Sequence, residues 1–205
     1  MMATLAVHTP LPLRLFVIRH GQTAWTVSGQ YTGATDIQLS PEGRSEAGLL
    51  RQLLRKYTFS SVFCSPLRRA RETCTLAGLA THAVVRDDLS EWNNGEDEGL
   101  TPPEIQILRP GWRFFQDGPK GGETLEQIKL RADTCLTELK HLEGNVAIFS
   151  HAHFCRVLAA RWIHSPVSDA QHFLLDTASF GILSYEHNRP TQPAIAMWNS
   201  AALAK

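Results

Sequence analysis

The sequence has no excess of charge of either sign: lysine plus arginine total 20 residues, and aspartate plus glutamate total 20. A chain without net charge has no overall field to attract nucleic acid or an anionic membrane. No run approaches the roughly 18 to 20 apolar residues that a membrane-spanning helix needs. We therefore expect neither a nucleic-acid nor a membrane partner, and any anion site must be built locally.

Cysteine is also scarce, and the four residues Cys64, Cys74, Cys135 and Cys155 contain no Cys-x-x-Cys pair. Their wide spacing, in a chain long enough to bury its own core, indicates reduced thiols rather than a disulfide framework. The N-terminal stretch lacks the cationic start of a signal peptide. These absences predict a cytoplasmic protein.

Linker-like stretches and fixed-period repeats are absent as well, so we expect one domain over residues 1–205, with residues 1–12 as a flexible N-terminal arm. Short apolar runs alternate with amphipathic helical segments. The expected strands cover residues 13–18, 61–65, 83–85, 146–149, 181–185 and 195–198. The expected helices cover 41–54, 66–76, 125–144 and 154–162, and 91–120 reads as a loop with short helical pieces. This alternation predicts an α/β fold, a three-layer α/β/α sandwich with a mostly parallel sheet.

Two of these strands run directly into polar loops that contain histidine, namely Arg19-His20-Gly21 and Ser150-His151-Ala152-His153. In such folds the carboxyl ends of the strands form the binding site. Hydrolysis of a phosphate monoester needs clustered positive donors, a nucleophile and an acid for the leaving oxygen. Arg19 could bind phosphate while a neutral His20 attacks phosphorus, its tautomer held by a carbonyl near Gly21. Taken alone, however, the Arg-His-Gly tripeptide is equally well explained as a chance strand end.

Further motifs follow in order along the chain and carry a family resemblance. They are Val17-Ile18-Arg19-His20-Gly21-Gln22-Thr23, Gly29-Gln30-Tyr31-Thr32-Gly33, Leu39-Ser40-Pro41-Glu42-Gly43, Ser65-Pro66-Leu67-Arg68-Arg69-Ala70, Leu89-Ser90-Glu91-Trp92, Gly121-Gly122-Glu123-Thr124 and Ser150-His151-Ala152-His153. Together they closely resemble the histidine phosphatase superfamily, the phosphoglycerate-mutase-like proteins. Gly29 to Gly33, Glu91-Trp92 and the later Asp117-Gly118 look closest to the sedoheptulose-1,7-bisphosphatase-like branch of sugar phosphatases.

The resemblance implies a role for each matching position. His20 would be the nucleophile that accepts the phosphoryl group, and Glu91 would be the proton donor. The other implied catalytic residues are Arg19 and Arg69, which would clamp the phosphoryl group, and His151, which would donate to the same oxygens. The implied substrate-binding residues are Thr26, Thr32, Gly33 and Ala152, with Thr26 replacing the asparagine usual in the mutases. Glu123 would contact the site or simply stabilise a helix start. No cofactor and no metal is implied.

The resemblance implies a phosphoric monoester hydrolase acting on a small phosphorylated metabolite such as a sugar phosphate or bisphosphate. Only about thirty residues separate Glu91 from the Gly-Gly-Glu-Thr motif, whereas the mutases carry a long insertion there that excludes water. A phosphoglycerate mutase, a phosphoprotein phosphatase and a non-catalytic phosphate-binding module stay open as alternatives, as does a homodimer. A metal site at His151, His153 and His20 is disfavoured because two arginines would oppose a cation. Arg109, Arg113 and Lys120 could bind a second phosphate or be solvated loop charges.

Overall fold

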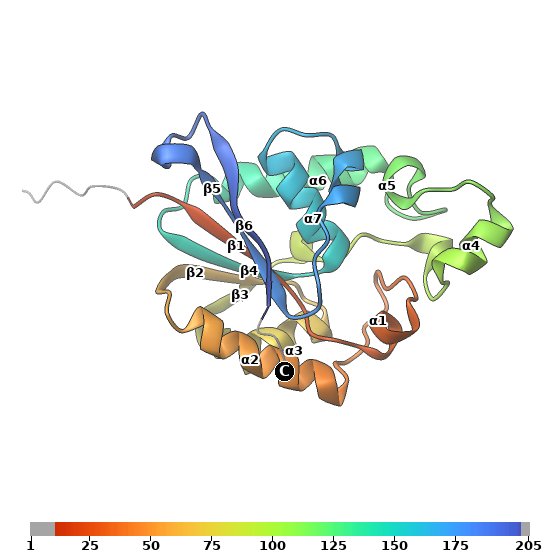
Figure 1. Ribbon diagram of the computed structural model, residues 1–205, viewed down its shortest axis with the longest axis horizontal. Coiled ribbons are helices and arrows are strands. Elements are labelled where there is room, and N and C mark those ends of the chain that lie inside the picture. Colours follow the sequence, from red (N-terminus) through yellow and green to blue (C-terminus); the bar gives the residue numbers. More distant parts are fainter. Residues whose placement is uncertain (1–10, 202–205) are drawn as a thin grey trace, which may run out of the picture.

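A computed structural model describes residues 11–201, so most of the predicted N-terminal arm lies outside the described residues. Six strands form one sheet in the order β3-β2-β4-β1-β5-β6 (Figure 1). Their bounds are β1 Arg14–Arg19, β2 Phe59–Cys64, β3 Ala83–Val85, β4 Asn145–Ser150, β5 Ser179–Tyr185 and β6 Pro193–Ala201. The pairings β1 with β4, β2 with β4 and β2 with β3 are parallel, and β5 pairs antiparallel with both β1 and β6, so that only β5 runs opposite to the other strands. The predicted mostly parallel sheet is confirmed.

Helices cover both faces of the sheet, which confirms the predicted α/β/α sandwich (Figure 1). The helices α2 Pro41–Leu54 and α3 Arg68–Leu76 lie on one face, and α6 Leu125–Leu139 and α7 Ala152–Trp162 lie on the other. Each face has its own apolar core, because side chains alternate across a strand. Phe16 and Ile18 pack toward α2 and α3, and Leu15 and Val17 pack on the opposite side.

The register of β1 and β4 positions the site. Val17 pairs with Ile148, and Arg19 pairs with Ser150. Both strands are apolar and buried up to this level, and the next residue of each is a histidine. At this level the segment after β1 is joined to β4 by a hydrogen bond of 3.1 Å from the His20 backbone N–H to the Ser150 carbonyl. His20 and His151 therefore leave the sheet at the same edge, as expected for parallel neighbours.

The loop predicted over 91–120 contains short helical pieces, as expected. These are the 3-10 helix η3 Gly95–Asp97 and the helices α4 Pro102–Leu108 and α5 Phe114–Asp117. They lie at one end of the molecule together with α1 Ala24–Ser28, a helix that was not predicted (Figure 1). The remaining 3-10 helices are η1 Ala80–His82, η2 Asp87–Leu89, η4 Val167–His172 and η5 Glu186–Asn188.

Three predicted helix boundaries were wrong, and one of them is the start of α7, which begins at Ala152 rather than Phe154. Helix α3 begins at Arg68 rather than Pro66, because Leu67 keeps an extended backbone. Helix α6 starts after Thr124 as predicted, with the expected capping box to Gln127, but it ends at Leu139 well before Gly144. Gly144 instead takes a left-handed backbone, with φ of 73°, in the turn that leads into β4.

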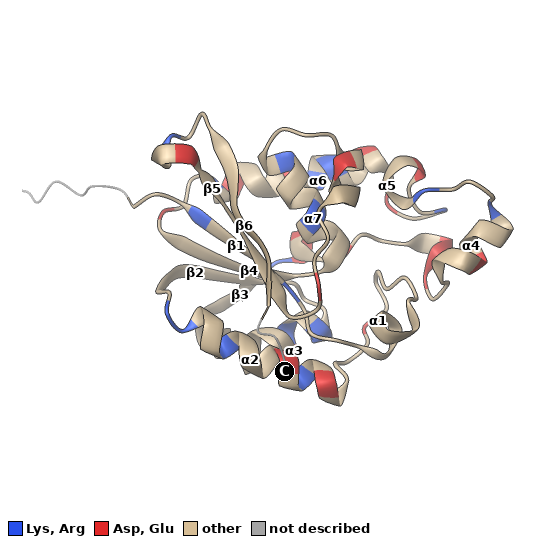
Figure 2. Cartoon of the chain, viewed as in Figure 1, with Lys and Arg blue, Asp and Glu red and all other residues tan. Residues whose placement is uncertain are grey.

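The four cysteines are free and buried, as predicted for thiols that belong to the core. Within residues 11–201, no helix is long and apolar enough to cross a membrane. Charges of both signs alternate along α2 (Figure 2), where Glu42, Arg44, Glu46 and Arg51 follow one another.

Candidate active site

His20 lies directly after β1, with only 4% of its surface exposed. Its Nδ1–H donates to the Gly21 carbonyl at 2.7 Å, the partner that the sequence had suggested. Burial and the neighbouring Arg69 and Arg19 lower the pKa of His20 well below the ordinary 6.5. The ring is therefore neutral near pH 7, and the carbonyl fixes the tautomer that leaves Nε2 unprotonated. This is the form in which an imidazole is a nucleophile.

A cavity of about 390 Å³ opens beside His20. Six of the predicted site residues line it, namely Arg19, His20, Thr26, Thr32, Glu91 and Ala152. These residues come from β1, α1, the loop that follows it, the segment after η2 and the start of α7. Arg69, His151 and Gly33 are not among the lining residues. The structure thus brings most of the predicted residues to one cavity and places the other three behind it.

Arg19 offers the cavity a cation with an unused donor. Its NH1 group donates to the Leu175 carbonyl at 2.6 Å. Its Nε is buried, and no group in the described part of the chain accepts from it. Because an unpaired buried donor is costly, such an atom marks a place for an anionic ligand.

Arg69 and His151 form a fully buried pair next to His20. Arg69 Nε donates to His151 Nδ1 at 3.1 Å, so the other ring nitrogen carries the proton and donates to Ser65 Oγ at 2.7 Å. Burial, Arg69 and His20 lower the pKa of His151 well below 6.5, in keeping with this neutral tautomer. The His20 and His151 rings lie 5.2 Å apart between centroids. All three Arg69 nitrogens donate to protein acceptors, so its contact with a phosphoryl group stays a prediction.

Glu91 lies at the N-terminus of helix α7. Its Oε1 accepts backbone N–H bonds from Trp92 and Phe154, both at 2.9 Å, and its Oε2 accepts one from His153 at 3.1 Å. These donors and the helix dipole fix the carboxylate at the wall of the cavity. The His153 ring lies 3.6 Å from Oε2, but burial lowers the pKa of His153 well below 6.5, so this contact is not an ion pair.

The loop that carries Glu91 is held from behind by Arg131. Arg131 NH1 donates to the carbonyls of Asp88 and Ser90 at 2.8 and 2.9 Å. Glu123 accepts two bonds from the same guanidinium, at 2.8 and 2.7 Å. Glu123 was predicted to contact the site or to stabilise a helix start. The structure shows that it instead holds the arginine that supports the Glu91 loop.

The predicted substrate-binding residues divide into two groups. Thr26 and Ala152 line the cavity, but the Thr26 hydroxyl already donates to the Thr23 carbonyl at 2.9 Å in the cap of α1. Ala152 is the first residue of α7, so its backbone N–H lies at a helix N-terminus. Thr32 lines the cavity, whereas the Gly33 N–H donates to Glu98 at 2.9 Å and its carbonyl accepts from Arg69.

The structure adds lining residues that the sequence reasoning missed. Arg156 lies one helical turn after Ala152 and donates to the Ala170 and Gln171 carbonyls at 2.9 and 3.0 Å. Burial lowers its pKa to about 10, so it stays cationic at neutral pH. Tyr31 stacks on Phe114, with 5.0 Å between ring centroids. The spacing of Arg156 from the histidine motif along one helix face could have indicated it.

The arginines and lysine considered for a second phosphate lie elsewhere. Arg109 pairs with the buried Asp97 at 2.5 Å, and Lys120 pairs with Glu96 at 2.7 Å. Neither these residues nor Arg113 line the cavity beside His20. Among residues 11–201, no group of three or more histidine, cysteine, aspartate or glutamate side chains is arranged to hold a metal ion.

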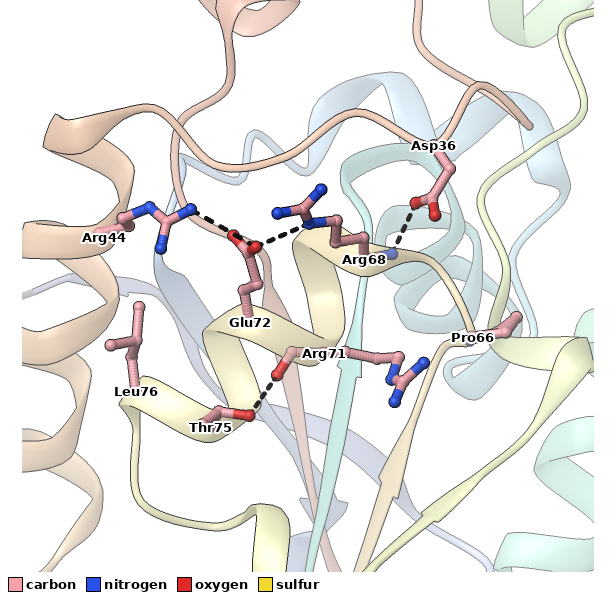
Figure 3. A pocket seen from close by; sticks show the side chains of 8 residues that line it. All are labelled: Asp36, Arg44, Pro66, Arg68, Arg71, Glu72, Thr75 and Leu76. Atoms are coloured by element: carbon pink, nitrogen blue, oxygen red, sulfur yellow. Dashed lines mark hydrogen bonds and ion pairs between the residues drawn. The ribbon is translucent and has the colours of Figure 1, made fainter.

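A second cavity, of about 500 Å³, lies on the outer side of α2 and α3 (Figure 3). Glu72 binds Arg44 at 3.5 Å and Arg68 at 2.9 Å there. Asp36 accepts the Arg68 backbone N–H at 2.6 Å. This cavity holds no histidine and none of the predicted catalytic side chains. Its importance for the site is that Asp36 ties the loop before it to the start of α3, next to Arg69.

Comparison with known proteins agrees with this geometry. The chain is similar to the acid phosphatase of Mycobacterium tuberculosis, with 39% identity over 85% of this chain and 87% of that protein. Sedoheptulose 1,7-bisphosphatase of Saccharomyces cerevisiae is 31% identical over 90% of this chain and 92% of its own. The 2,3-bisphosphoglycerate-dependent phosphoglycerate mutase of Cytophaga hutchinsonii is also 31% identical, over 80% and 84%.

A solved structure and a family model complete the comparison. The structure of an open reading frame product from Mycobacterium tuberculosis superposes with a TM-score of 0.86 and 37% identity, over 92% of this chain and 97% of that one. The family model of the histidine phosphatase superfamily (branch 1) matches residues 15–200, which include every residue placed around the cavity. The chain therefore belongs to branch 1 of the histidine phosphatase superfamily and is an enzyme of that type.

Proposed function

We propose that this enzyme hydrolyses a small phosphorylated metabolite, a sugar phosphate or bisphosphate, through a phosphohistidine on His20 and without a metal. The observation that carries the proposal is the neutral, tautomer-fixed His20 in one cavity with the carboxylate of Glu91 and the free Nε of Arg19. These three groups supply the nucleophile, the acid and a positive donor that phosphoryl transfer requires.

The reaction takes two steps, and both are substitutions at the phosphorus atom that involve His20 Nε2 and Glu91. His20 Nε2 attacks phosphorus in line, so that an N–P bond forms while the bond to the leaving oxygen breaks and Glu91 protonates that oxygen. Glu91 then takes a proton from water, the water oxygen attacks phosphorus, and the N–P bond breaks to release phosphate. Arg19 and Arg69 stabilise the transferred group, and His151 holds Arg69 Nε on its side of His20.

A further cation in the cavity wall supports a substrate with a second anionic group. Arg156 lines the cavity and keeps its charge at neutral pH, and Trp25 and Tyr31 add aromatic rings to the wall. An extended polar ligand with two phosphates would place one beside His20 and the other near Arg156. The yeast relative is named for a sugar bisphosphate, which agrees with this class of substrate.

A mutase is the second candidate, because a phosphoglycerate mutase has the same 31% identity to this chain as the bisphosphatase, over a smaller share of it. The short segment between Glu91 and Gly121 favours hydrolysis, since it leaves room for water to reach the intermediate. Isomerisation of phosphoglycerates after addition of 2,3-bisphosphoglycerate, faster than phosphate release, would favour the mutase.

The decisive measurement is phosphate release in EDTA from sugar phosphates, sugar bisphosphates, phosphoglycerates and a phosphopeptide. We expect release by the parent protein and a loss of about 10³-fold or more in His20→Ala, because the nucleophile is gone. His141→Ala removes an exposed histidine and serves as the control. A parent protein inactive on every compound, or a His20→Ala protein as active as the control, would overturn the proposal.

We further propose that the enzyme acts in the cytoplasm on a diffusing metabolite, as one domain, with no nucleic-acid or membrane partner. The balanced charge and the four free thiols support this assignment. Cell fractionation followed by gel filtration tests it and also shows whether the protein is a homodimer.

A further inference from the structure

Glu98 is a half-buried carboxylate that the catalytic scheme does not use. It follows η3 and binds three successive backbone N–H groups in the loop after α1. Oε1 accepts from Gly33 at 2.9 Å and from Thr35 at 2.7 Å, and Oε2 accepts from Ala34 at 3.1 Å. Successive N–H groups that converge on one anion form a concave site of positive partial charge. Here the anion is a side chain of the same protein.

The opposite side of the same loop holds Arg69. Arg69 NH1 donates to the Thr35 carbonyl and NH2 to the Gly33 carbonyl, both at 2.9 Å. The Gly33 carbonyl and the Ala34 N–H belong to one peptide unit, so a single amide lies between Glu98 and the guanidinium. An amide that accepts from a cation and donates to an anion is polarised by both, which strengthens each bond.

The loop cannot easily shift away from this arrangement. A Cβ atom on Gly33 would lie 2.8 Å from both the Asn94 nitrogen and the Trp92 carbonyl oxygen, so only glycine permits this close approach. At the other end of the loop, Asp36 binds the first residue of α3 (Figure 3). Glu98 is therefore the charged group that sets how the loop carbonyls face Arg69.

We propose that Glu98 is a positioning residue for phosphoryl transfer: through the peptide units of residues 33–35 it fixes Arg69, which in turn holds His151 beside His20. The proposal rests on the proposed function, because it requires Arg69 and His151 to act on the phosphoryl group. It also explains why all three Arg69 nitrogens are bound by protein: the guanidinium is held in place before a substrate arrives.

The test compares Glu98→Gln with Glu96→Gln, a control from the same short segment whose carboxylate is exposed and binds Lys120. Glutamine keeps the shape of Glu98 but loses the charge and one acceptor. We expect kcat/KM for phosphate release and the affinity for orthovanadate each to fall about tenfold in Glu98→Gln. A small displacement of Arg69 is enough for this, since catalytic rates fall steeply when a group is misplaced. The melting temperature should change little, and the control should match the parent protein.

Glu98→Ala removes both acceptor oxygens, and with them all three hydrogen bonds, and allows a rescue experiment. With both carboxylate oxygens gone, kcat/KM should fall about 100-fold, and added acetate should restore part of it by placing a carboxylate on the same N–H groups. Acetate should not raise the activity of Glu98→Gln, where the space is filled. If the parent protein releases phosphate while Glu98→Gln equals its control in activity and vanadate affinity, the proposal is wrong and the proposed function stands. A parent protein that releases no phosphate refutes the proposed function instead.

Discussion

At the scale of single residues, the site combines buried cations with uncharged imidazoles. His20 and His151 have lowered pKa values because burial and nearby arginines disfavour a further positive charge. Burial of the rings and the charges of the arginines thus keep both imidazoles neutral near pH 7. Each imidazole keeps one tautomer through one hydrogen bond, to Gly21 for His20 and from Arg69 for His151.

The pH dependence of His20 follows from the direction of this shift. A histidine is neutral above its pKa, so a lowered value extends the reactive form into the acid range. We expect no loss of kcat/KM attributable to His20 between pH 7 and pH 6, and its ring resonance in a histidine NMR titration should not change near pH 6.5. Arg19→Gln should raise the His20 pKa toward 6.5, because it removes a positive neighbour. A parent His20 that titrates at 6.5 would contradict this.

Arg156 gives a prediction about specificity. Its cation lies in the cavity wall, so Arg156→Gln should raise KM for a sugar bisphosphate by about tenfold or more. KM for the corresponding monophosphate should change far less. Arg161→Gln is the control, since Arg161 lies on the same helix but binds Asp133 at 2.8 Å outside the cavity. Equal effects on both substrates would argue against a second anionic subsite near Arg156.

At the scale of elements, the loop that carries His20 packs directly on the start of α2. A Cβ atom on Gly21 would lie 2.3 Å from the Gly43 carbonyl oxygen, and one on Gly43 would lie 2.1 Å from the Gln22 carbonyl oxygen. The two backbones therefore touch without side chains between them. This contact fixes the His20 loop against a helix that contains none of the predicted site residues.

Alanine substitutions at the two glycines of α2 distinguish the effect of this contact from the effect of helix propensity, because only Gly43 touches the His20 loop. Gly43→Ala should lower the melting temperature and kcat together, because the added methyl group must push the His20 loop away. Gly48 lies on the same helix with nothing within 4 Å of an added Cβ atom. Gly48→Ala should leave kcat unchanged and stabilise the protein by roughly 0.5 to 1 kcal/mol. Thermal melts and initial rates of Gly43→Ala and Gly48→Ala test this difference. If the two variants had the same melting temperature and the same kcat, the contact between α2 and the His20 loop would be refuted.

The main elements and the gathering of six predicted site residues around one cavity were predictable because their signals are local. An apolar run followed by a polar loop identifies a strand end, and the Thr124 capping box identifies a helix start. Helix α1 was missed because its five residues bury no apolar face. The Glu98 contacts with residues 33–35 could not be predicted, since they depend on two loops meeting in space. The hydrogen bonds from Arg69 to His151, Gly33 and Thr35 could not be predicted for the same reason.

At the scale of the whole molecule, the buried histidines link stability to pH. The pKa values of His20, His151 and His153 are all lowered, so below about pH 6.5 the unfolded chain binds protons that the native protein does not. Each group should then remove up to about 1.4 kcal/mol of stability per pH unit as the pH falls.

Urea unfolding between pH 8 and pH 5 measures this effect. We expect the urea midpoint to fall steadily as the pH drops below about 6.5. His153→Phe should reduce the slope of unfolding free energy against pH by the contribution of one histidine. His187→Ala is the control, because that side chain is 75% exposed. A midpoint independent of pH, or a steeper slope in His153→Phe, would contradict the assignment of neutral buried histidines.

The place of β1 in the sheet also governs when the enzyme becomes active during its own synthesis. Strand β1 lies between β4 and β5, both of which are made much later. Until β4 and β5 have been made, the backbone N–H and C=O groups along both edges of β1 have no partner strand, and His20 has no His151 beside it. We therefore expect a nascent chain that ends before β4 to lack phosphatase activity and to expose an unpaired apolar strand. Activity should appear only in the last third of translation.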